Sequence, residues 1–418
     1  MSALRPDRLG ANVPIADIAG VARAEPVDVL APDGARRHAV LYEPLSGRAR
    51  VALHLMHPKT DQSRNYLLPA LLGAGYAVLA GGSRWVHNDT ATVHERLVLD
   101  VAGGVRLLRE RGYSTVALVG NSGGGTLAAF YQSQAERAGE RLTETPAGDR
   151  LDLNAYDLPA ADAVALVGAH RGEGQVLRRW IDPSVLDEQD PYAVDAGLDM
   201  YDPANGFRCP PGASRYDPDF VVRYRAAQDR RVRRLDELAR AAVERRREAR
   251  RSLRSAGPAD RLGLERAAAT GALLTISRTE ADPAFLDLAL EPDDRPLGSP
   301  LSLRPDLANV SSAGFARVVT PQAWLSTWSA TATNADTARC LAQLAAPLLV
   351  VHYAGDGFTK RAQMREAFDL ASSPDKTYHE VGNVDHYGFT IVDAAHRGPR
   401  SPESAELLIE WLRGRLRV

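Results

Sequence analysis

A glycine-rich stretch within Val116–Tyr131 has the residue types and the spacing that a covalent reaction needs. The stretch, VALVGNSGGGTLAAFY, passes from β-branched and apolar residues through a Gly-x-Ser-x-Gly turn centred on Ser122 into a run of small residues. A buried strand, this turn and a helix, in that order, are typical of a nucleophile elbow. Side chains two positions from the serine would clash in so sharp a turn, which explains the glycines. The pattern predicts that Ser122 is a nucleophile.

The Gly-x-Ser-x-Gly string alone is weakly specific, because glycine-rich turns also join strands to helices or hold phosphates. No lysine follows the glycines as in a Walker loop, and the dinucleotide-binding spacing is not matched. In the serine interpretation, the N–H of Gly123 lies where a developing oxyanion can use it, and the helix N-terminus adds partial positive charge. Gly123 is therefore predicted to be an oxyanion donor.

A serine hydroxyl needs a base to take its proton, and the base needs a third group to orient it. Among the ten histidines, His386 lies in a short loop directly after the last predicted strand. From there an imidazole can reach back over the sheet. His352 and His379 lie inside predicted strands, and His396 follows no strand end. His386 is therefore the predicted base.

The predicted acid is Asp356, which lies just past the end of the strand Leu348–Tyr353. Functional groups gather at the carboxyl edge of a parallel sheet, which favours this position. The alternative interpretation is a turn aspartate that caps the following helix. Asp385 is a rival for the same role, although neighbours in sequence seldom orient one another's side chains well.

The remaining pattern predicts an α/β domain with a long insertion. Alternation on both sides of a Pro-Asp-Gly turn predicts a hairpin of Pro26–Leu30 and Arg37–Glu43, and strands then alternate with helices. Such alternation indicates a mainly parallel sheet with helices on both faces. It stops at about residue 171 and returns near residue 337. Residues 1–170 and 335–418 are thus predicted to form the core domain, and residues 171–334 the insertion.

Two further segments have a distinctive composition. Met1–Glu25 is predicted to be an irregular arm, and Asp217–Arg254 one long helix with an apolar stripe. The other faces of this helix carry many arginines mixed with acidic residues. A solvated helix with ion pairs between residues four positions apart is the favoured interpretation. A nucleic-acid surface is the alternative, but interleaved aromatic residues and a module signature are missing.

Ser122, Asp356 and His386 follow predicted strands in an order that resembles the α/β-hydrolase superfamily, whose triad runs nucleophile, acid, histidine. The resemblance covers the sheet-forming parts, about Pro26–His170 and Thr337–Val418. Hairpin, oxyanion strand, elbow, insertion, acid strand and histidine loop all fall in family order. The resemblance implies a mainly parallel, doubly wound α/β-hydrolase sheet with an antiparallel N-terminal hairpin. It also implies a mostly helical cap, formed by the insertion, before the acid-bearing strand.

The loop after the third predicted strand departs from the family pattern. Family members often carry His-Gly there, and the residue after that glycine supplies an oxyanion N–H. Here the loop reads His57-Pro58-Lys59, and proline has no N–H to donate. By position Lys59 is predicted to be the second oxyanion donor, with Thr60 or His57 as alternatives. His57 could instead fix the loop.

Aromatic residues gather in the insertion, although they make up only 6% of the chain. Their clustering predicts a pocket for a large apolar or aromatic group. The alternative is that they build the insertion's own core. Outside the insertion, Trp85 follows the fourth predicted strand near the mouth of the site. The candidate substrate contacts are His57, Trp85, Trp180, Trp324, Trp328 and Tyr387.

These features predict an α/β-fold serine hydrolase. It would cleave a carboxylic ester or lactone of a bulky, fairly hydrophobic small molecule through an acyl-enzyme. The same triad could alternatively hydrolyse a C–C bond of a diketone-type substrate, an amide or a thioester, or transfer an acyl group. A non-catalytic binder of small molecules is a third class, but it would not need all three triad residues. No metal or organic cofactor is required.

The 418 residues, 44% hydrophobic and 25% charged, have the composition of a soluble globular protein. The net charge of −2 gives no general attraction to nucleic acid or anionic membrane, and no stretch is apolar for long enough to span a bilayer. Cys209 and Cys340 lie in no C-x-x-C pattern, and the N-terminus has no apolar leader segment. We therefore expect a cytoplasmic protein with a small-molecule substrate and no nucleic-acid or membrane partner. A homodimer through the arginine-rich helix is left open.

Overall fold

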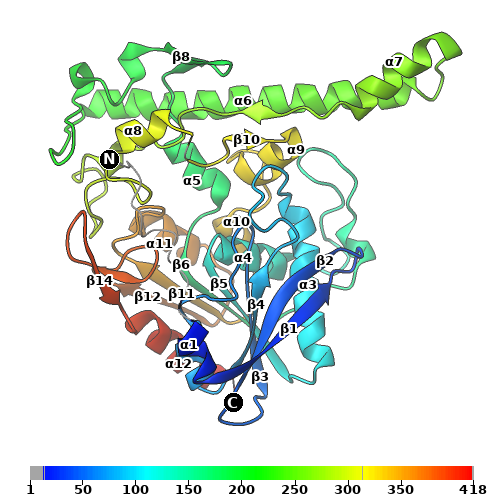
Figure 1. The fold of residues 1–418 in the computed structure, drawn as a ribbon, viewed down its shortest axis with the longest axis vertical. Helices are drawn as coiled ribbons and strands as arrows, with labels where there is room; N and C mark the ends of the chain where they lie inside the picture. Colours follow the sequence, from blue (N-terminus) through cyan, green and yellow to red (C-terminus); the bar gives the residue numbers. More distant parts are fainter. Residues whose placement is uncertain (1–12, 14, 313, 417–418) are drawn as a thin grey trace.

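The computed structural model describes residues 13, 15–312 and 314–416 and contains a central sheet of eight strands (Figure 1). The strands are β1 (Ala22–Leu30), β2 (Arg36–Pro44), β3 (Val51–His57), β4 (Ala77–Gly82), β5 (Thr115–Ser122), β6 (Ala163–Ala169), β11 (Leu348–Tyr353) and β12 (Lys376–Val381). Their order in the sheet is β1-β2-β4-β3-β5-β6-β11-β12. β2 is antiparallel to β1 and β4, and the other neighbouring pairs are parallel. The predicted α/β-hydrolase sheet with an antiparallel N-terminal hairpin is confirmed.

Helices cover both faces of this sheet, because its central strands are apolar on both sides. All residues of β3, β4, β6 and β11 are buried, as expected for parallel strands between two helical layers. One apolar cluster joins the sheet to α3 (His94–Glu110), α4 (Gly123–Ala135), α10 (Thr337–Leu341) and α11 (Arg361–Asp369). A second cluster joins the opposite face to α1 (Ile15–Ala19), α2 (Leu68–Gly73) and α12 (Glu403–Arg415). The doubly wound arrangement is thus confirmed.

Between β6 and β11 the chain leaves the sheet and forms a layer above the carboxyl ends of the parallel strands (Figure 1). Two apolar clusters hold this layer together. Its elements are α5 (Glu173–Trp180), β7 (Val185–Asp187), β8 (Asp190–Val194), α6 (Pro218–Ser252), α7 (Pro258–Ala269), β9 (Leu274–Thr275), α8 (Pro305–Val310), β10 (Val318–Val319), α9 (Pro321–Ala323) and a π-helical turn (Trp324–Trp328). Short 3-10 turns lie at Leu153–Ala155, Ala196–Leu198, Pro203–Asn205 and Pro283–Phe285.

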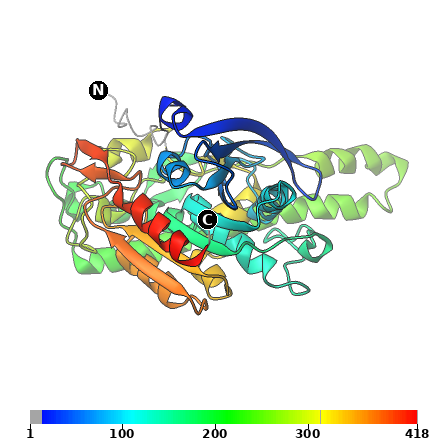
Figure 2. The same ribbon diagram turned by 90° about the horizontal axis from the view of Figure 1, so that it is seen from below.

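The long helix predicted in the insertion is confirmed as α6, which has 35 residues. It crosses the whole layer, and its far end extends with α7 beyond the sheet in both views (Figures 1 and 2). The helix begins where the Asp217 carboxylate accepts hydrogen bonds from the N–H groups of Asp219 and Phe220. Among the helices in the described part of the chain, none is both long and apolar enough to cross a membrane.

The arginines of α6 differ from the prediction, because several of them bind other elements instead of residues on their own helix. Arg231 is buried, pairs with Glu188 at 2.6 Å and donates to the carbonyl oxygens of Asp182 and Ser277. Pairs within the helix, such as that between Arg251 and acidic residues one or two turns away, occur near its exposed end. The inner arginines therefore tie the loops of the insertion to α6.

Two parts of the core domain were not predicted correctly. The supposed irregular arm contains α1, and β1 already begins at Ala22; residues 1–12 and 14 lie outside the described residues. The four residues after Ala22 in β1 are all exposed, so this part of the strand lacks the alternation that identifies a strand. After His386 the chain forms a hairpin of β13 (Phe389–Ile391) and β14 (Arg397–Arg400). The latter contains Gly and Pro, which are depleted in strands.

Candidate active site

The turn between β5 and α4 holds Ser122 in an unusual backbone conformation. Its φ of 57° and ψ of −130° lie outside the regions that L-residues prefer, at a cost of roughly 1–3 kcal/mol. Neighbouring glycines make the turn possible. A Cβ at Gly120 would collide with Gly125, and one at Gly124 would collide with the carbonyl oxygen of Met56. The serine is thereby raised at the carboxyl end of a central strand.

The structure brings Ser122, His386 and Asp356 into one hydrogen-bonded line. His386 Nε2 lies 2.8 Å from Ser122 Oγ, and His386 Nδ1 lies 2.7 Å from Asp356 Oδ2. An ionised carboxylate can only accept, so Nδ1 carries the proton and Nε2 offers its lone pair to the serine hydroxyl. Ser122 is the last residue of β5, and Asp356 and His386 lie in the segments that follow β11 and β12.

Asp356 is buried in the turn after β11, with 1% of its surface exposed. Burial alone would raise the pKa of its carboxyl group. The His386 imidazole and a hydrogen bond of 2.7 Å from the N–H of Phe358 outweigh that effect and hold the pKa below its usual value. The aspartate therefore remains ionised and keeps the imidazole oriented.

The rival carboxylate, Asp385, shapes the loop that carries His386. It accepts hydrogen bonds from the N–H groups of Tyr387 at 2.9 Å and Phe389 at 3.1 Å, and it pairs with Arg397 at 2.6 Å. Arg397 belongs to β14, which the sequence did not predict. Asp385 therefore fixes the His386 loop through hydrogen bonds within the loop and through an ion pair with β14.

The oxyanion loop after β3 is arranged differently from the prediction. His57 Nδ1 accepts hydrogen bonds from the N–H of Lys59 at 3.0 Å and the N–H of Thr60 at 3.1 Å. The prediction that the Lys59 N–H is the second oxyanion donor is therefore wrong, because the loop itself uses that N–H. Since Nδ1 accepts, the ring proton sits on Nε2. Nε2 lies 3.1 Å from the position that a Cβ on Gly123 would occupy.

His170 repeats this arrangement on the other side of β5. It follows β6, and its Nδ1 accepts a hydrogen bond of 3.0 Å from the N–H of Gly172. Burial lowers the pKa of His170 to about 4 and that of His57 to about 3, with the Glu173 carboxylate opposing the shift in both. Two neutral imidazoles thus flank the serine strand. The sequence analysis missed His170, although it follows a buried strand just as the triad residues do.

Glu173, the first residue of α5, is a second site residue that the sequence analysis missed. It is 3% exposed, and its Oε2 lies 3.4 Å from His94 Nε2. Its Oε1 would collide with a Cβ on Gly123, so it lies directly beside the residue after the nucleophile. Burial would raise its pKa, but the adjacent His94 and the Lys59 ammonium hold the pKa below the usual value. An acidic residue in a first helical turn is ordinary in sequence, so nothing distinguished it.

The described His, Cys, Asp and Glu side chains form no group of three or more that could hold a metal ion. The histidines around Ser122 are held instead as hydrogen-bonding groups.

Two predicted substrate contacts lie next to the site but behind other side chains. Trp180 stacks on Phe358 at 5.0 Å between ring centroids, and Phe358 covers the His386 imidazole at 4.2 Å. Trp328 faces the oxyanion loop, where the Lys59 ammonium lies 4.6 Å from its ring centroid. Both tryptophans are 1% exposed, so they support site residues from behind.

Trp324 is placed differently from the prediction. Its ring is fully buried in the apolar cluster of the insertion, and its Nε1 donates to Asp236 at 2.7 Å. The prediction that Trp324 contacts substrate is therefore wrong. The alternative interpretation, an aromatic residue of the insertion's own core, describes it.

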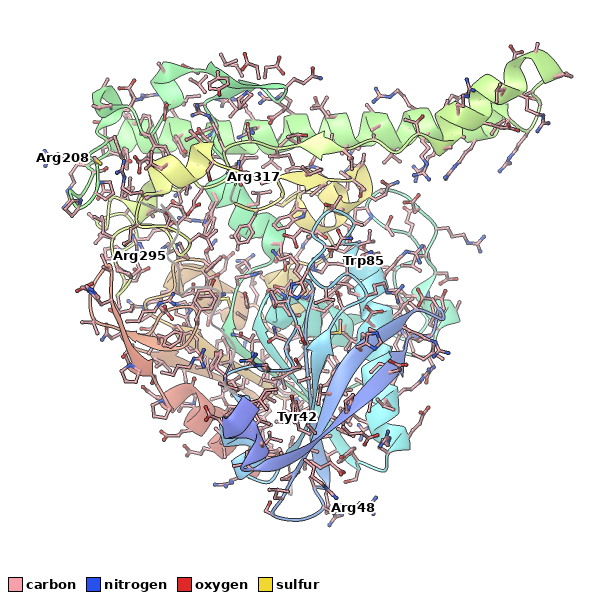
Figure 3. All side chains as sticks on the ribbon, in the orientation of Figure 1. Tyr42, Arg48, Trp85, Arg208, Arg295 and Arg317 are labelled. Carbon is pink, nitrogen blue, oxygen red and sulfur yellow. The ribbon has the colours of Figure 1, made fainter. Side chains whose placement is uncertain are left out.

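Tyr387 and Trp85 lie in different parts of the molecule. A narrow cavity of about 30 Å³ borders His386 and Tyr387, and Arg295 from the insertion forms part of its wall. Trp85 packs against the apolar cluster beneath α3. Figure 3 shows Trp85 and Arg295 on opposite sides of the molecule. Trp85 is distant from this cavity, but its backbone N–H donates to Ser83 Oγ, which in turn donates to the carbonyl oxygen of Pro58 in the oxyanion loop, so its place at the site mouth stays a prediction.

Neither a family model nor a curated protein matches the chain. Solved structures do resemble it. An esterase from Pyrococcus furiosus is 10% identical, with 99% of each chain covered and a TM-score of 0.47. The alpha/beta hydrolase GrgF from Penicillium sp. sh18 is 12% identical, covers 95% of this chain and 100% of its own, and has a TM-score of 0.48. The esterase domain of a Rhodothermus marinus protein is 13% identical, with 94% and 98% covered and a TM-score of 0.42.

The chain has an α/β-hydrolase fold. The order of its eight strands and the strained turn at Ser122 establish this from the structure itself. With identities of 10–13% and TM-scores of 0.42–0.48, the solved structures add nothing to this assignment and nothing about the substrate.

The buried neutral histidines make stability depend on pH. In the unfolded chain His57 and His170 bind protons below about pH 6.5, whereas in the fold they stay neutral until about pH 3 and pH 4. The unfolded state therefore gains protons as the pH falls from 7 to 5, and stability decreases by about 2 kcal/mol for each ring. Urea unfolding at both pH values should show a smaller decrease in His57→Gln and in His170→Gln. An unchanged decrease, equal to that of the exposed control His38→Gln, would contradict the assignment.

Proposed function

We propose that this protein is a serine hydrolase that cleaves a carboxylic ester or lactone of a bulky, fairly hydrophobic small molecule through an acyl-enzyme. The observation that carries the proposal is the continuous line from Ser122 Oγ through the His386 imidazole to Asp356 Oδ2, with hydrogen bonds of 2.8 and 2.7 Å. A protein that only bound its ligand would need neither the buried acid nor the strained serine.

In the proposed first step, His386 Nε2 takes the proton of Ser122 as Oγ attacks the carbonyl carbon and the carbonyl electron pair moves to oxygen. The carbonyl then re-forms, the bond to the alcohol oxygen breaks, and His386 returns the proton to the leaving alkoxide. Water repeats both steps on the acyl-enzyme and releases the acid. Asp356 stabilises the imidazolium that forms in each half of the cycle.

The oxyanion would be held by the N–H of Gly123 and the Nε2–H of His57. Pro58 has no N–H, and the next two N–H groups of the loop both bind His57 Nδ1. By donating to Nδ1, these two N–H groups fix the proton of the His57 ring on Nε2, which lies beside Gly123. A neutral imidazole donor has a fixed direction and no need to reorganise when charge develops, which suits an oxyanion hole.

The insertion, residues 171–334, would act as a cap over this site. Its Trp180 stacks on Phe358, and its Trp328 lies beside the Lys59 ammonium, so the insertion contacts residues on both sides of the triad. The cavity next to His386, about 30 Å³, has room for about one water molecule. A bulky substrate therefore requires the cap residues that line this cavity, Arg295 among them, to move before the ester can reach Ser122.

Three substrates that share one phenyl-containing apolar group test the bond type: an ethyl ester, an amide and a 1,3-diketone. We expect the ester to have the highest kcat/KM, by roughly 100-fold or more, because an alkoxide is a better leaving group than an amine or a carbanion. Ser122→Ala should lower ester turnover by roughly 10⁴-fold or more and Asp356→Asn by about 10⁴-fold. Preferential cleavage of the diketone or amide, identified by its products, would contradict the ester assignment.

His57→Leu tests the second oxyanion donor. We expect kcat to fall by roughly 10²–10³-fold with KM little changed, because the oxyanion exists only near the transition state. His38→Leu is the control, since the side chain of His38 is 93% exposed and distant in the sheet order. A rise in KM of the same size with unchanged kcat would contradict this assignment, because His57 would then bind substrate without stabilising the oxyanion.

A further inference from the structure

Glu173 is a buried carboxylate beside the nucleophile that the reaction steps above do not use. Its Oε1 has no hydrogen-bond partner among the described residues, its Oε2 lies 3.4 Å from His94 Nε2, and only 3% of the residue is exposed. A buried charged oxygen without a donor is costly, by roughly 1–3 kcal/mol or more. Such a group is therefore expected where a ligand supplies the missing donor.

The backbone around Glu173 fixes the position of this carboxylate. A Cβ at Gly172 would collide with the carbonyl oxygen of Ala335, and a Cβ at Gly174 would lie 2.9 Å from the nitrogen of Ala330. The start of α5 is thus packed tightly against the segment that returns to the core domain. The glutamate cannot move outward with its helix end, and its Oε1 stays directed at Gly123.

His94 does not supply the missing donor for Oε1. Thr327 Oγ1 donates to the carbonyl oxygen of Thr92 at 2.7 Å, so it accepts from His94 Nδ1 at 3.1 Å, and that nitrogen carries a proton. His94 Nε2 faces the other oxygen, Oε2, at 3.4 Å. If it is protonated it pairs with Oε2 alone, and if it is not it adds another acceptor. In both states Oε1 remains without a donor.

Lys59 does not supply it either. Its ammonium group lies 4.5 Å from the ring centroid of Phe315 and 4.6 Å from that of Trp328, and it pairs with Asp89 at 3.6 Å. These contacts direct the lysine towards the cap aromatic residues and the loop after β4. The free acceptor at Oε1 is therefore available to a group that enters with the substrate.

We propose that Glu173 Oε1 accepts a hydrogen bond from a hydroxyl or ammonium group that the substrate carries one or two carbons from the carbonyl that Ser122 attacks. The distance follows from the site, because Oε1 lies against Gly123, the same residue whose N–H holds the oxyanion. Glu173 is then a specificity residue, because an ester without such a donor leaves Oε1 buried with no hydrogen bond. The inference rests on the proposed function, because it takes Ser122 as the nucleophile.

Four matched ethyl esters test the inference: 3-phenylpropanoate, 2-hydroxy-3-phenylpropanoate, 3-hydroxy-3-phenylpropanoate and 3-amino-3-phenylpropanoate. We expect kcat/KM of the best donor-bearing ester to exceed that of the plain ester by roughly 100-fold or more, as for sites built to pair a polar group. The hydroxyl and amino esters distinguish the two kinds of donor.

Two variants of the same residue separate recognition from folding. Glu173→Leu removes the acceptor, so the ratio between donor-bearing and plain esters should fall to the ratio measured for their uncatalysed hydrolysis by hydroxide. Glu173→Gln keeps an acceptor oxygen without the charge, so it should retain part of a hydroxyl preference and lose an ammonium preference. Glu265→Gln on α7, 51% exposed and at the far tip of the insertion, should leave the ratio unchanged (Figure 1).

Fluorophosphonate labelling of Ser122 in the wild-type protein separates a failure of the proposed function from a failure of the inference about Glu173. If neither a fluorophosphonate nor a smaller phosphonate labels Ser122, the proposed function fails. If Ser122 is labelled but the four esters react alike, or none with a donor is hydrolysed, the inference about Glu173 fails alone. A preference that persists unchanged in Glu173→Leu would also overturn it.

Discussion

The strained turn at Ser122 is the constraint on which the arrangement of this site depends. A serine at φ 57° and ψ −130° lies outside the left-handed helical region and persists only where the surrounding packing holds it. Here β5 runs into α4 so closely that side chains at Gly120, Gly124 and Gly125 would meet backbone or Ala169. The strain is therefore maintained by contacts on both sides of the strand. The same contacts bring the loops after β3 and β6 against the serine.

Those two loops give the site its electrostatic character. Each ends a buried strand with a histidine whose Nδ1 accepts backbone N–H groups, so both rings are neutral and present an Nε2–H. Burial, which disfavours the charged form, keeps them so. His386 has the opposite tautomer because Asp356 accepts from its Nδ1. Two imidazole donors and one imidazole base thus surround Ser122. The group that each Nδ1 contacts decides which ring is a donor and which is the base.

Site residues at the ends of strands could be predicted from the sequence. Site residues whose role depends on contacts between distant segments could not. Ser122, Asp356 and His386 follow apolar runs, so their meeting at one sheet edge followed from the parallel sheet. The hydrogen bond between the N–H of Lys59 and His57 depends on how one loop turns, which the residue types do not specify. Glu173 resembles any acidic residue at a helix start, and only the packing of α5 against Gly123 distinguishes it.

Fluorophosphonate labelling followed by intact mass measurement tests most directly whether Ser122 is activated. Wild-type protein should gain one adduct, Ser122→Ala none, and His386→Ala and Asp356→Asn should react far more slowly, because both hydrogen bonds of the line are needed to activate the hydroxyl. A smaller phosphonate serves as a second reagent, since the cavity beside His386 is narrow. If folded wild-type protein gains no adduct with either reagent, or if Ser122→Ala is labelled equally, Ser122 is not an activated nucleophile.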